Sequence, residues 1–195
     1  MSNSAILLAA GCSTRFGRDK RRELIAGIPL LLQSALAYKR LVGDTIVVLG
    51  PDDTELAELL RNHDIASCPC EGSTRGMGYS VAAGVAQRAG SDGWLIAPAD
   101  LPLIRADTIE KVLHAGRVHA IAAPVYRGQR GHPVWFDATY LSALRGLSGD
   151  HGAKAILSDH SEDLHLIEVD DVGCVFDIDY PTDLALARAR MQPSG

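Results

Sequence analysis

Short, unbroken apolar runs recur along this chain, and most are followed by a segment whose apolar residues fall at helical spacing. Runs such as AILLAA (residues 5–10) and TIVVL (residues 45–49) show no alternation of polar and apolar residues, as expected of strands covered on both faces. Strands that alternate with helices predict βαβ units and a mainly parallel sheet between two layers of helices. The predicted fold class is therefore an α/β three-layer sandwich of Rossmann-like type.

The predicted elements fill the chain without a linker, an internal repeat or a low-complexity tract, so we expect one domain over residues 1–195. Right-handed crossovers bring the loops after parallel strands to one edge of the sheet, where ligands are expected. Residues 126–160 are the candidate for a cap over that edge, on the acceptor side. Strands are predicted at residues 5–10, 45–49, 65–68, 94–97, 120–125, 133–136, 164–169 and 174–178, and helices at residues 31–41, 51–61, 79–88, 106–115, 139–146, 152–157 and 181–191.

Composition narrows the class of partner. Hydrophobic residues make up 47% and charged residues 22% of the chain, as in ordinary folded domains. The formal net charge of -5 argues against nucleic acid and anionic membranes as partners, so a bound anion needs a local cluster of donors. Cys12, Cys68, Cys70 and Cys174 lack the spacing of a zinc site or a disulfide framework and are expected to be reduced thiols. Without a signal peptide or a membrane span, a cytoplasmic location is expected.

The first apolar run leads into the segment GCSTRFGRDKRR. Gly11 and Gly17 allow the backbone to turn its N–H groups toward a ligand, as loops that cradle phosphates do. Ser13 adds a hydroxyl donor, and Arg15 and Lys20 add cationic donors that suit phosphate oxygens. The spacing matches neither the Walker loop nor the G-x-G-x-x-G fingerprint of dinucleotide-dependent oxidoreductases. The segment therefore predicts a phosphate site, and the alternative interpretation is a surface turn with a solvated basic run.

Carboxylates stand where a metal ion could meet that phosphate. Asp100 stands three residues after the apolar run WLIA (residues 94–97), so a buried strand delivers it to the ligand-binding edge. Mg²⁺ usually takes one or two protein carboxylates together with phosphate oxygens. Asp177 and Asp179 lie at i and i+2 of a predicted strand and share a face, and we favour Asp177 as the second ligand. Asp179 stays open, because it could equally cap the last helix, and Asp100 could be an ordinary turn residue.

Two further segments carry weaker signals. Gly76, Met77, Gly78 and Ser80 form a Gly-rich stretch before a predicted helix, where the chain can pass close to a base or ribose and the helix N-terminus favours negative charge. His132 stands out among the seven histidines because Gly131-His132-Pro133 forms a constrained turn. A substrate-side role and a loop histidine with no such role are equally open for it.

These motifs resemble a known family. LLAAGCSTRFGRDK, followed by GIPLL, resembles the LAAGxSxRxGxxK and GxPLL opening of the MobA-like nucleotidyltransferases. The strings GMG, ADLP, RGHPVWF, GDHGAKAIL and DIDYPTDL resemble the molybdenum cofactor cytidylyltransferase branch of that superfamily. The resemblance runs from residue 6 to about residue 187 and implies a Rossmann-like nucleotidyltransferase fold with Mg²⁺ as cofactor. The family loop commonly continues after its lysine with small or apolar residues, whereas Arg21 and Arg22 follow Lys20 here.

The resemblance implies a role for each matching residue. Arg15, Lys20 and Asp100 would be catalytic, and Asp100 and Asp177 would hold the metal ion. The residues implied to face the acceptor are His132, Asp150 and Gly152. The residues implied to bind the nucleotide are Leu8, Ala9, Ala10, Gly11, Ser13, Arg15, Gly17, Lys20, Gly76, Met77, Gly78 and Ser80.

The implied reaction transfers CMP from CTP to the terminal phosphate of molybdopterin or molybdenum cofactor and releases pyrophosphate. The attacking phosphate is already an anion, so positioning and charge neutralisation suffice without a general base. A molybdoenzyme or its chaperone is the expected recipient of the product. One alternative is a related enzyme that uses GTP or another NTP, or a sugar or alcohol phosphate as acceptor. Another is a non-catalytic protein that binds a nucleotide or cofactor.

Overall fold

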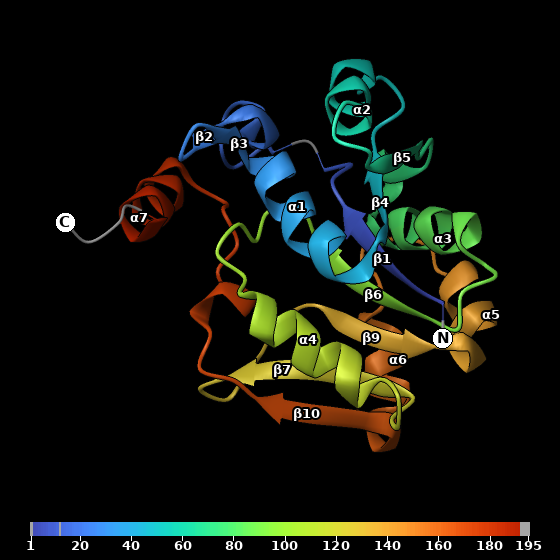
Figure 1. Ribbon diagram of the computed structural model, residues 1–195. Coiled ribbons are helices and arrows are strands. Elements are labelled where there is room, and N and C mark those ends of the chain that lie inside the picture. Colours follow the sequence, from blue (N-terminus) through green and yellow to red (C-terminus); the bar gives the residue numbers. More distant parts are fainter. Residues whose placement is uncertain (1, 12, 192–195) are drawn as a thin grey trace.

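The computed structural model describes residues 2–11 and 13–191 and centres on one mixed β-sheet (Figure 1). The strand order is β10-β7-β9-β6-β1-β4-β5, and β8 pairs with β7 outside this path. Neighbours along the path run parallel except for β9, which is antiparallel to β6 and β7. The strands of the sheet are β1 (Asn3–Leu8), β4 (Asp44–Leu49), β5 (Ala66–Pro69), β6 (Gly93–Pro98), β7 (Ile121–Tyr126), β8 (Gln129–Arg130), β9 (Val134–Asp137) and β10 (Leu164–Glu168).

Helices cover both faces of the sheet. Apolar side chains of α1, α2 and α4 pack on one face, and those of α3, α5 and α6 pack on the other. Ala5 and Leu7 of β1 belong to the first core, while Ile6 between them belongs to the second. Alternate side chains of a strand point to opposite faces, so burial on both faces accounts for the unbroken apolar run. The predicted three-layer fold is confirmed. The helices are α1 (Leu30–Val42), α2 (Thr54–Arg61), α3 (Met77–Gln87), α4 (Ala106–Ala115), α5 (Leu141–Arg145), α6 (Lys154–Asp159) and α7 (Pro181–Met191).

A smaller apolar cluster lies beside the sheet and joins the two ends of the chain. It combines Phe16 from the loop after β1 with Ile178 and the α7 residue Leu184. A two-stranded ribbon of β2 (Leu24–Ile25) and β3 (Ile28–Pro29), absent from the sequence prediction, adds Ile25 to this cluster. Figure 1 shows α7 beside this ribbon, away from the other helices. The cluster brings the glycine-rich basic loop and the segment before α7 together.

The prediction of a strand over residues 174–178 is wrong. The chain there passes from the 3₁₀ turn Val172–Cys174 into irregular structure, and the described residues 174–178 contain no strand. Buried Asp171 accepts hydrogen bonds from the Gly173 N–H (2.9 Å) and from the Thr108 hydroxyl (2.7 Å). A carboxylate that bonds a backbone N–H two residues ahead forms a turn in place of a strand. Asp177 and Asp179 therefore do not share the face of a strand.

Part of the segment over residues 126–160, which is expected from the sequence to form a cap, belongs to the sheet. Residues 134–137 form β9, which lies between β6 and β7 in the middle of the sheet. Its three apolar residues are buried, as a central strand requires. Only the segment that follows, with α5 and α6, lies outside the sheet, on the face covered by α3.

Cys68, Cys70 and Cys174 are buried free thiols, whereas Cys12 lies outside the described residues. Burial raises the pKa of the Cys68 thiol to about 11 and that of the Cys174 thiol to about 11, so both are protonated at neutral pH. Among residues 2–11 and 13–191, no helix is both long and apolar enough to cross a membrane.

The pairing of β6 with β9 leaves no room for a side chain at Gly93. A Cβ atom there would lie 2.2 Å from the Trp135 ring and 2.9 Å from the Phe136 carbonyl oxygen. We expect Gly93→Ala to lower the free energy of unfolding by about 1–3 kcal/mol, as overpacking does. Gly90→Ala, where nothing lies within 4 Å, should change it by less than about 0.5 kcal/mol. Urea unfolding of both variants measures this, and equal stabilities would contradict the close β6–β9 packing.

Candidate active site

A cleft of ≈ 570 Å³ opens where β1 and β6 end and α3 begins. It combines the three segments predicted to carry chemistry: the basic loop, the Gly-rich stretch and the turn at Asp100. Both signs of charge meet in it, because Arg15, Lys20 and Arg21 line it together with Asp100 and two further aspartates. The lining residues are 8–11, 13–16, 20, 21, 73, 74, 76, 77, 80, 98–100, 150 and 179.

The loop after β1 is held at its middle by an aromatic anchor. Phe16 is buried, and its N–H donates to the Ser13 carbonyl (3.0 Å). Ser13 and Gly17 both have positive φ, 50° and 80°. Gly17 adopts this conformation at little cost because glycine has no Cβ atom. Arg15 remains 68% exposed at the cleft. The loop thus directs a cation toward solvent while its aromatic neighbour fixes the backbone.

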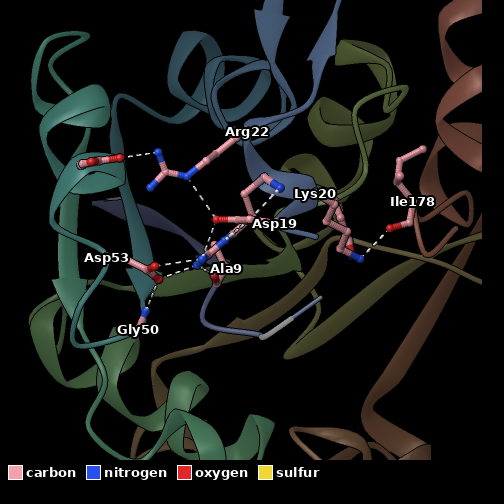
Figure 2. A network of polar contacts seen from close by, with 10 residues as sticks. Ala9, Asp19, Lys20, Arg22, Gly50, Asp53 and Ile178 are labelled. Carbon is pink, nitrogen blue, oxygen red and sulfur yellow. Dashed lines mark hydrogen bonds and ion pairs between the residues drawn. The ribbon is translucent and has the colours of Figure 1, made fainter. Parts of the chain in front are cut away.

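Lys20 is the most buried cation of the cleft, with a side chain 13% exposed. Its ammonium group donates to Asp100 Oδ2 (2.7 Å), to the Ile178 carbonyl (2.5 Å; Figure 2) and to Asp179 Oδ1 (3.2 Å). Burial lowers the pKa of Lys20, but the charge of Asp100 and the bonds to both carboxylates outweigh it and hold the pKa above its ordinary value. Lys20 is therefore a permanent positive charge at the end of β6.

Asp179 pairs with both predicted triphosphate-binding cations. Besides Lys20, it binds Arg15, whose Nη1 lies 2.5 Å from Asp179 Oδ2. Burial alone would raise the pKa of Asp179, yet the bonds from Arg15 and Lys20 hold it below its ordinary range. The carboxylate is thus ionised at neutral pH and holds both cations in the cleft.

Asp100 offers an oxygen suited to a metal ion. Its Oδ2 accepts from Lys20, while its buried Oδ1 has no hydrogen-bond partner in the described part of the chain. Burial raises the pKa of Asp100, and the positive charge of Lys20 opposes that rise. The Asp177 carboxylate also raises this pKa, so it lies near enough to act on Asp100. Asp177 itself is exposed and is not among the described residues that line the cleft.

The Gly-rich stretch and the segment around Asp150 touch directly. The Gly78 N–H donates to the Gly149 carbonyl (2.8 Å), and a Cβ at Gly76 would lie 2.2 Å from Gly149 atoms. Gly76 has φ of 133°, which other residues rarely adopt. Met77, half exposed, and Asp150 both line the cleft. The glycines are needed here for backbone contact, which places the predicted nucleotide and acceptor segments side by side.

Four further predicted residues are not among the described residues that line the cleft. They are Gly17, Gly78, Gly152 and His132, although Gly152 lies against Met77, which does line it. The His132 N–H donates to the Cys174 carbonyl (2.8 Å), and its buried Nδ1 lacks a partner among the described residues. Burial lowers the pKa of His132 to about 4, so the ring is neutral at neutral pH. Its role toward the acceptor stays a prediction.

Sequence reasoning passed over three polar residues that line the cleft. Ser73 and Thr74 add hydroxyl groups from the turn before α3, and Arg21 adds a guanidinium beside Lys20. The signal for the hydroxyls was their place in the Gly-rich stretch. The signal for Arg21 was its departure from the small or apolar residues common at this point of the loop.

Comparison with protein families identifies the class of this cleft. The model described as "MobA-like NTP transferase domain" matches residues 5–164, from β1 to the first residue of β10. The chain belongs to the MobA-like NTP transferase family. The predicted superfamily is thus confirmed, and membership of this family supports nucleotidyltransferase activity with an NTP as substrate.

Relatives of this MobA-like protein carry different names. "Purine catabolism protein PucB" of Bacillus subtilis is 30% identical and covers 95% of this chain and 96% of its own. "Nicotine blue oxidoreductase" of Paenarthrobacter nicotinovorans is 29% identical over 90% of this chain and 91% of its own. "Phosphoenolpyruvate guanylyltransferase" of Sphaerobacter thermophilus is 32% identical over 88% of this chain and 82% of its own. Membership of the family therefore leaves the base and the acceptor open.

A solved structure shares the fold across nearly the whole chain. Rv0371c of Mycobacterium tuberculosis, in complex with manganese, has a TM-score of 0.81 at 19% identity and covers 97% of this chain and 99% of its own. At this identity the similarity shows the fold alone, and it agrees with the Rossmann-like architecture of the MobA-like chain.

The lowered pKa of His132 makes a prediction about acid stability. An unfolded histidine has a pKa near 6.5, so between that pH and about 4 the unfolded state binds a proton that the folded state excludes. Stability present above pH 6.5 is therefore lost as the pH falls. We expect the wild type to lose about 2–3 kcal/mol more than His132→Asn between pH 7 and pH 4. Urea unfolding across this range measures it, and parallel pH profiles would show that His132 is not buried in the neutral form.

Proposed function

We propose that this protein transfers CMP from CTP to the terminal phosphate of a molybdopterin-type cofactor, releases pyrophosphate, and does so in the cytoplasm. The observation that carries the proposal is the meeting of Lys20, Arg15, Asp100 and Asp179 in one cleft. Two cationic donors next to two carboxylates suit a metal-bound triphosphate, whose oxygens need several positive partners.

The chemistry requires little of the side chains beyond position and charge. The terminal phosphate of the acceptor attacks the α-phosphorus of CTP in line with the departing pyrophosphate, and as an anion it needs no base. Lys20 and Arg15 bind triphosphate oxygens once these replace the Asp179 carboxylate as their partner. Each such contact supplies about 2–4 kcal/mol of transition-state stabilisation, by analogy with single preorganised donors.

A divalent ion fits the acidic side of the cleft. The unpartnered Oδ1 of Asp100 is a hard oxygen ligand of the kind that Mg²⁺ prefers. When bound, Mg²⁺ supplies positive charge to the triphosphate oxygens. The manganese in the Rv0371c complex supports a divalent ion in this fold. The sequence favoured Asp177 as second ligand, whereas Asp179 lines the cleft, so we propose Asp179 for this role.

The acceptor is assigned to the segment that touches the Gly-rich stretch. Asp150 lines the cleft, and Gly152 lies against Met77, since a Cβ at Gly152 would be 3.1 Å from the Met77 sulfur. We propose that this segment and the neighbouring α5 and α6 bind the pterin, and that a molybdoenzyme or its chaperone receives the product. The strings RGHPV and GDHGA support this acceptor. A second candidate is guanylyl transfer to a small phosphorylated acid, favoured by the guanylyltransferase relative.

The proposal is tested by pyrophosphate release from CTP, GTP, ATP or UTP, each with Mg²⁺ and either molybdenum cofactor or phosphoenolpyruvate. We expect release with CTP and the cofactor to exceed every other pair. Lys20→Ala is the control and should reduce turnover at least ~100-fold, because one preorganised charge is lost. Release from GTP with phosphoenolpyruvate alone would favour the second candidate. Nucleotide binding without release under any pair would identify a non-catalytic binding protein.

The choice between the two carboxylates before α7 can be decided by metal activation. We expect Asp179→Asn and Asp100→Asn to raise the Mg²⁺ concentration for half-maximal activity by about 10-fold or more, as loss of a ligand does. Asp177→Asn, as the exposed matched control, should shift it by less than about twofold. Titration of activity with Mg²⁺ at saturating nucleotide measures this. The reverse order would return the ligand role to Asp177.

A further inference from the structure

Arg21 differs from the other cations of the cleft because every N–H of its guanidinium is already bonded. A guanidinium has five N–H donors. Nε donates to Asp19 Oδ1 (2.8 Å), and Nη2 donates to Asp19 Oδ2 (3.0 Å) and Asp53 Oδ1 (2.8 Å). Nη1 donates to the Ala9 carbonyl (2.7 Å) and to Asp53 Oδ2. The five donors therefore match five acceptors of the protein itself.

Three consecutive basic residues thus face three different environments. Figure 2 shows Lys20 beside Ile178 on one side, while Asp19, Asp53 and Ala9 gather on the other. Arg22 is 49% exposed and pairs with Asp19 and with Glu55 of α2 at the surface. Arg21, by contrast, is 15% exposed and lines the cleft. The short 3₁₀ turn Lys20–Arg22 separates the three side chains.

The acceptors of Arg21 belong to three separate segments of the chain. The Ala9 carbonyl lies just after β1, and Asp19 begins the 3₁₀ turn that carries Lys20. Asp53 follows β4, and its Oδ2 also accepts the Gly50 N–H (2.8 Å), so it fixes its own turn. Burial alone would raise the pKa of Asp19, yet the bonds from Arg21 hold it below its ordinary range. Arg21 is thus the shared cationic partner of Asp19 and Asp53, and Arg22 also pairs with Asp19.

We propose that Arg21 is a positioning residue, which binds no substrate atom and holds residues 9–11 and Lys20 in the geometry that receives the triphosphate. The inference rests on the proposed nucleotide binding and explains why a large cation follows Lys20 in this chain. With Arg21 in place, the backbone after β1 cannot move independently of the turn that carries Lys20. Donors held in advance bind a polyanion more tightly than donors that must first be ordered.

The test compares Arg21→Lys with its matched neighbour Arg22→Lys by calorimetric titration of Mg–CTP, or Mg–GTP if the wild type prefers it, into the full chain. Lysine keeps the charge but has only three donors around one nitrogen, so it cannot join three segments. We expect Arg21→Lys to raise the nucleotide Kd about 10- to 100-fold. Arg22→Lys should change it by less than about twofold. A purely structural role would lower the melting temperature of Arg21→Lys and leave its Kd unchanged, which would overturn the proposal.

Asp53→Asn distinguishes positioning from direct contact, and serves if Arg21→Lys does not fold. Asp53 is not among the described residues that line the cleft but is bonded to Arg21, which does line it, so we expect its effect on nucleotide binding to pass through Arg21. We expect Asp53→Asn to raise the nucleotide Kd. Combining it with Arg21→Lys should raise the Kd no further, because both changes disrupt the same contact between Arg21 and Asp53. Wild-type affinity in Asp53→Asn beside a weakened Arg21→Lys would show direct contact and overturn the proposal. A wild type that binds no NTP would instead overturn the proposed function.

Discussion

The ammonium group of Lys20 is the contact on which the arrangement of the cleft depends. It joins the loop after β1 to Asp100 at the end of β6 and to Ile178 and Asp179 before α7. The Ile178 N–H also donates to the Asp100 carbonyl (3.1 Å), so the backbone of these two segments is joined as well. Removing one partner of a buried ion pair costs about 3–5 kcal/mol, because the other charge is left unpaired. Charge balance therefore holds together three segments that are distant in the sequence.

The same balance explains how a chain with net charge -5 can receive a polyanion. Asp179 holds Lys20 and Arg15 in the cleft, and in the proposed function phosphate oxygens would replace this carboxylate as the partner of both cations. Arg21 has no such freedom, because its five donors have acceptors in the protein itself. In the proposed function, Lys20 and Arg15 would exchange partners when the triphosphate binds, whereas Arg21 would keep its partners and hold the backbone in place.

Backbone contact decides the other side of the cleft. Gly76 and Gly78 lie so close to residues 148–150 that a Cβ at either position would overlap main-chain atoms. The first turn of α3 and the segment around Asp150 are thus one surface, although some 70 residues separate them in the sequence. A reaction between a nucleotide and a second phosphate needs both partners within bonding distance, and in the proposed function this surface would bind them side by side.

The sequence by itself determined the layers and the position of the loop. Residues 5–10 and 45–49 are apolar without alternation because their side chains are buried on both faces of the sheet. The residue types alone therefore predict that these strands are buried. Only the tertiary structure decided which residues pair across long distances. Asp171 accepts from Thr108 and turns the chain where residues 174–178 read as a strand, and β9 enters the sheet between β6 and β7. The pairing of Asp53 with Arg21 is a further example. The sequence predicts that Asp53 lies at the start of a helix, but the crossover between β1 and β4 determines that this segment lies beside Arg21.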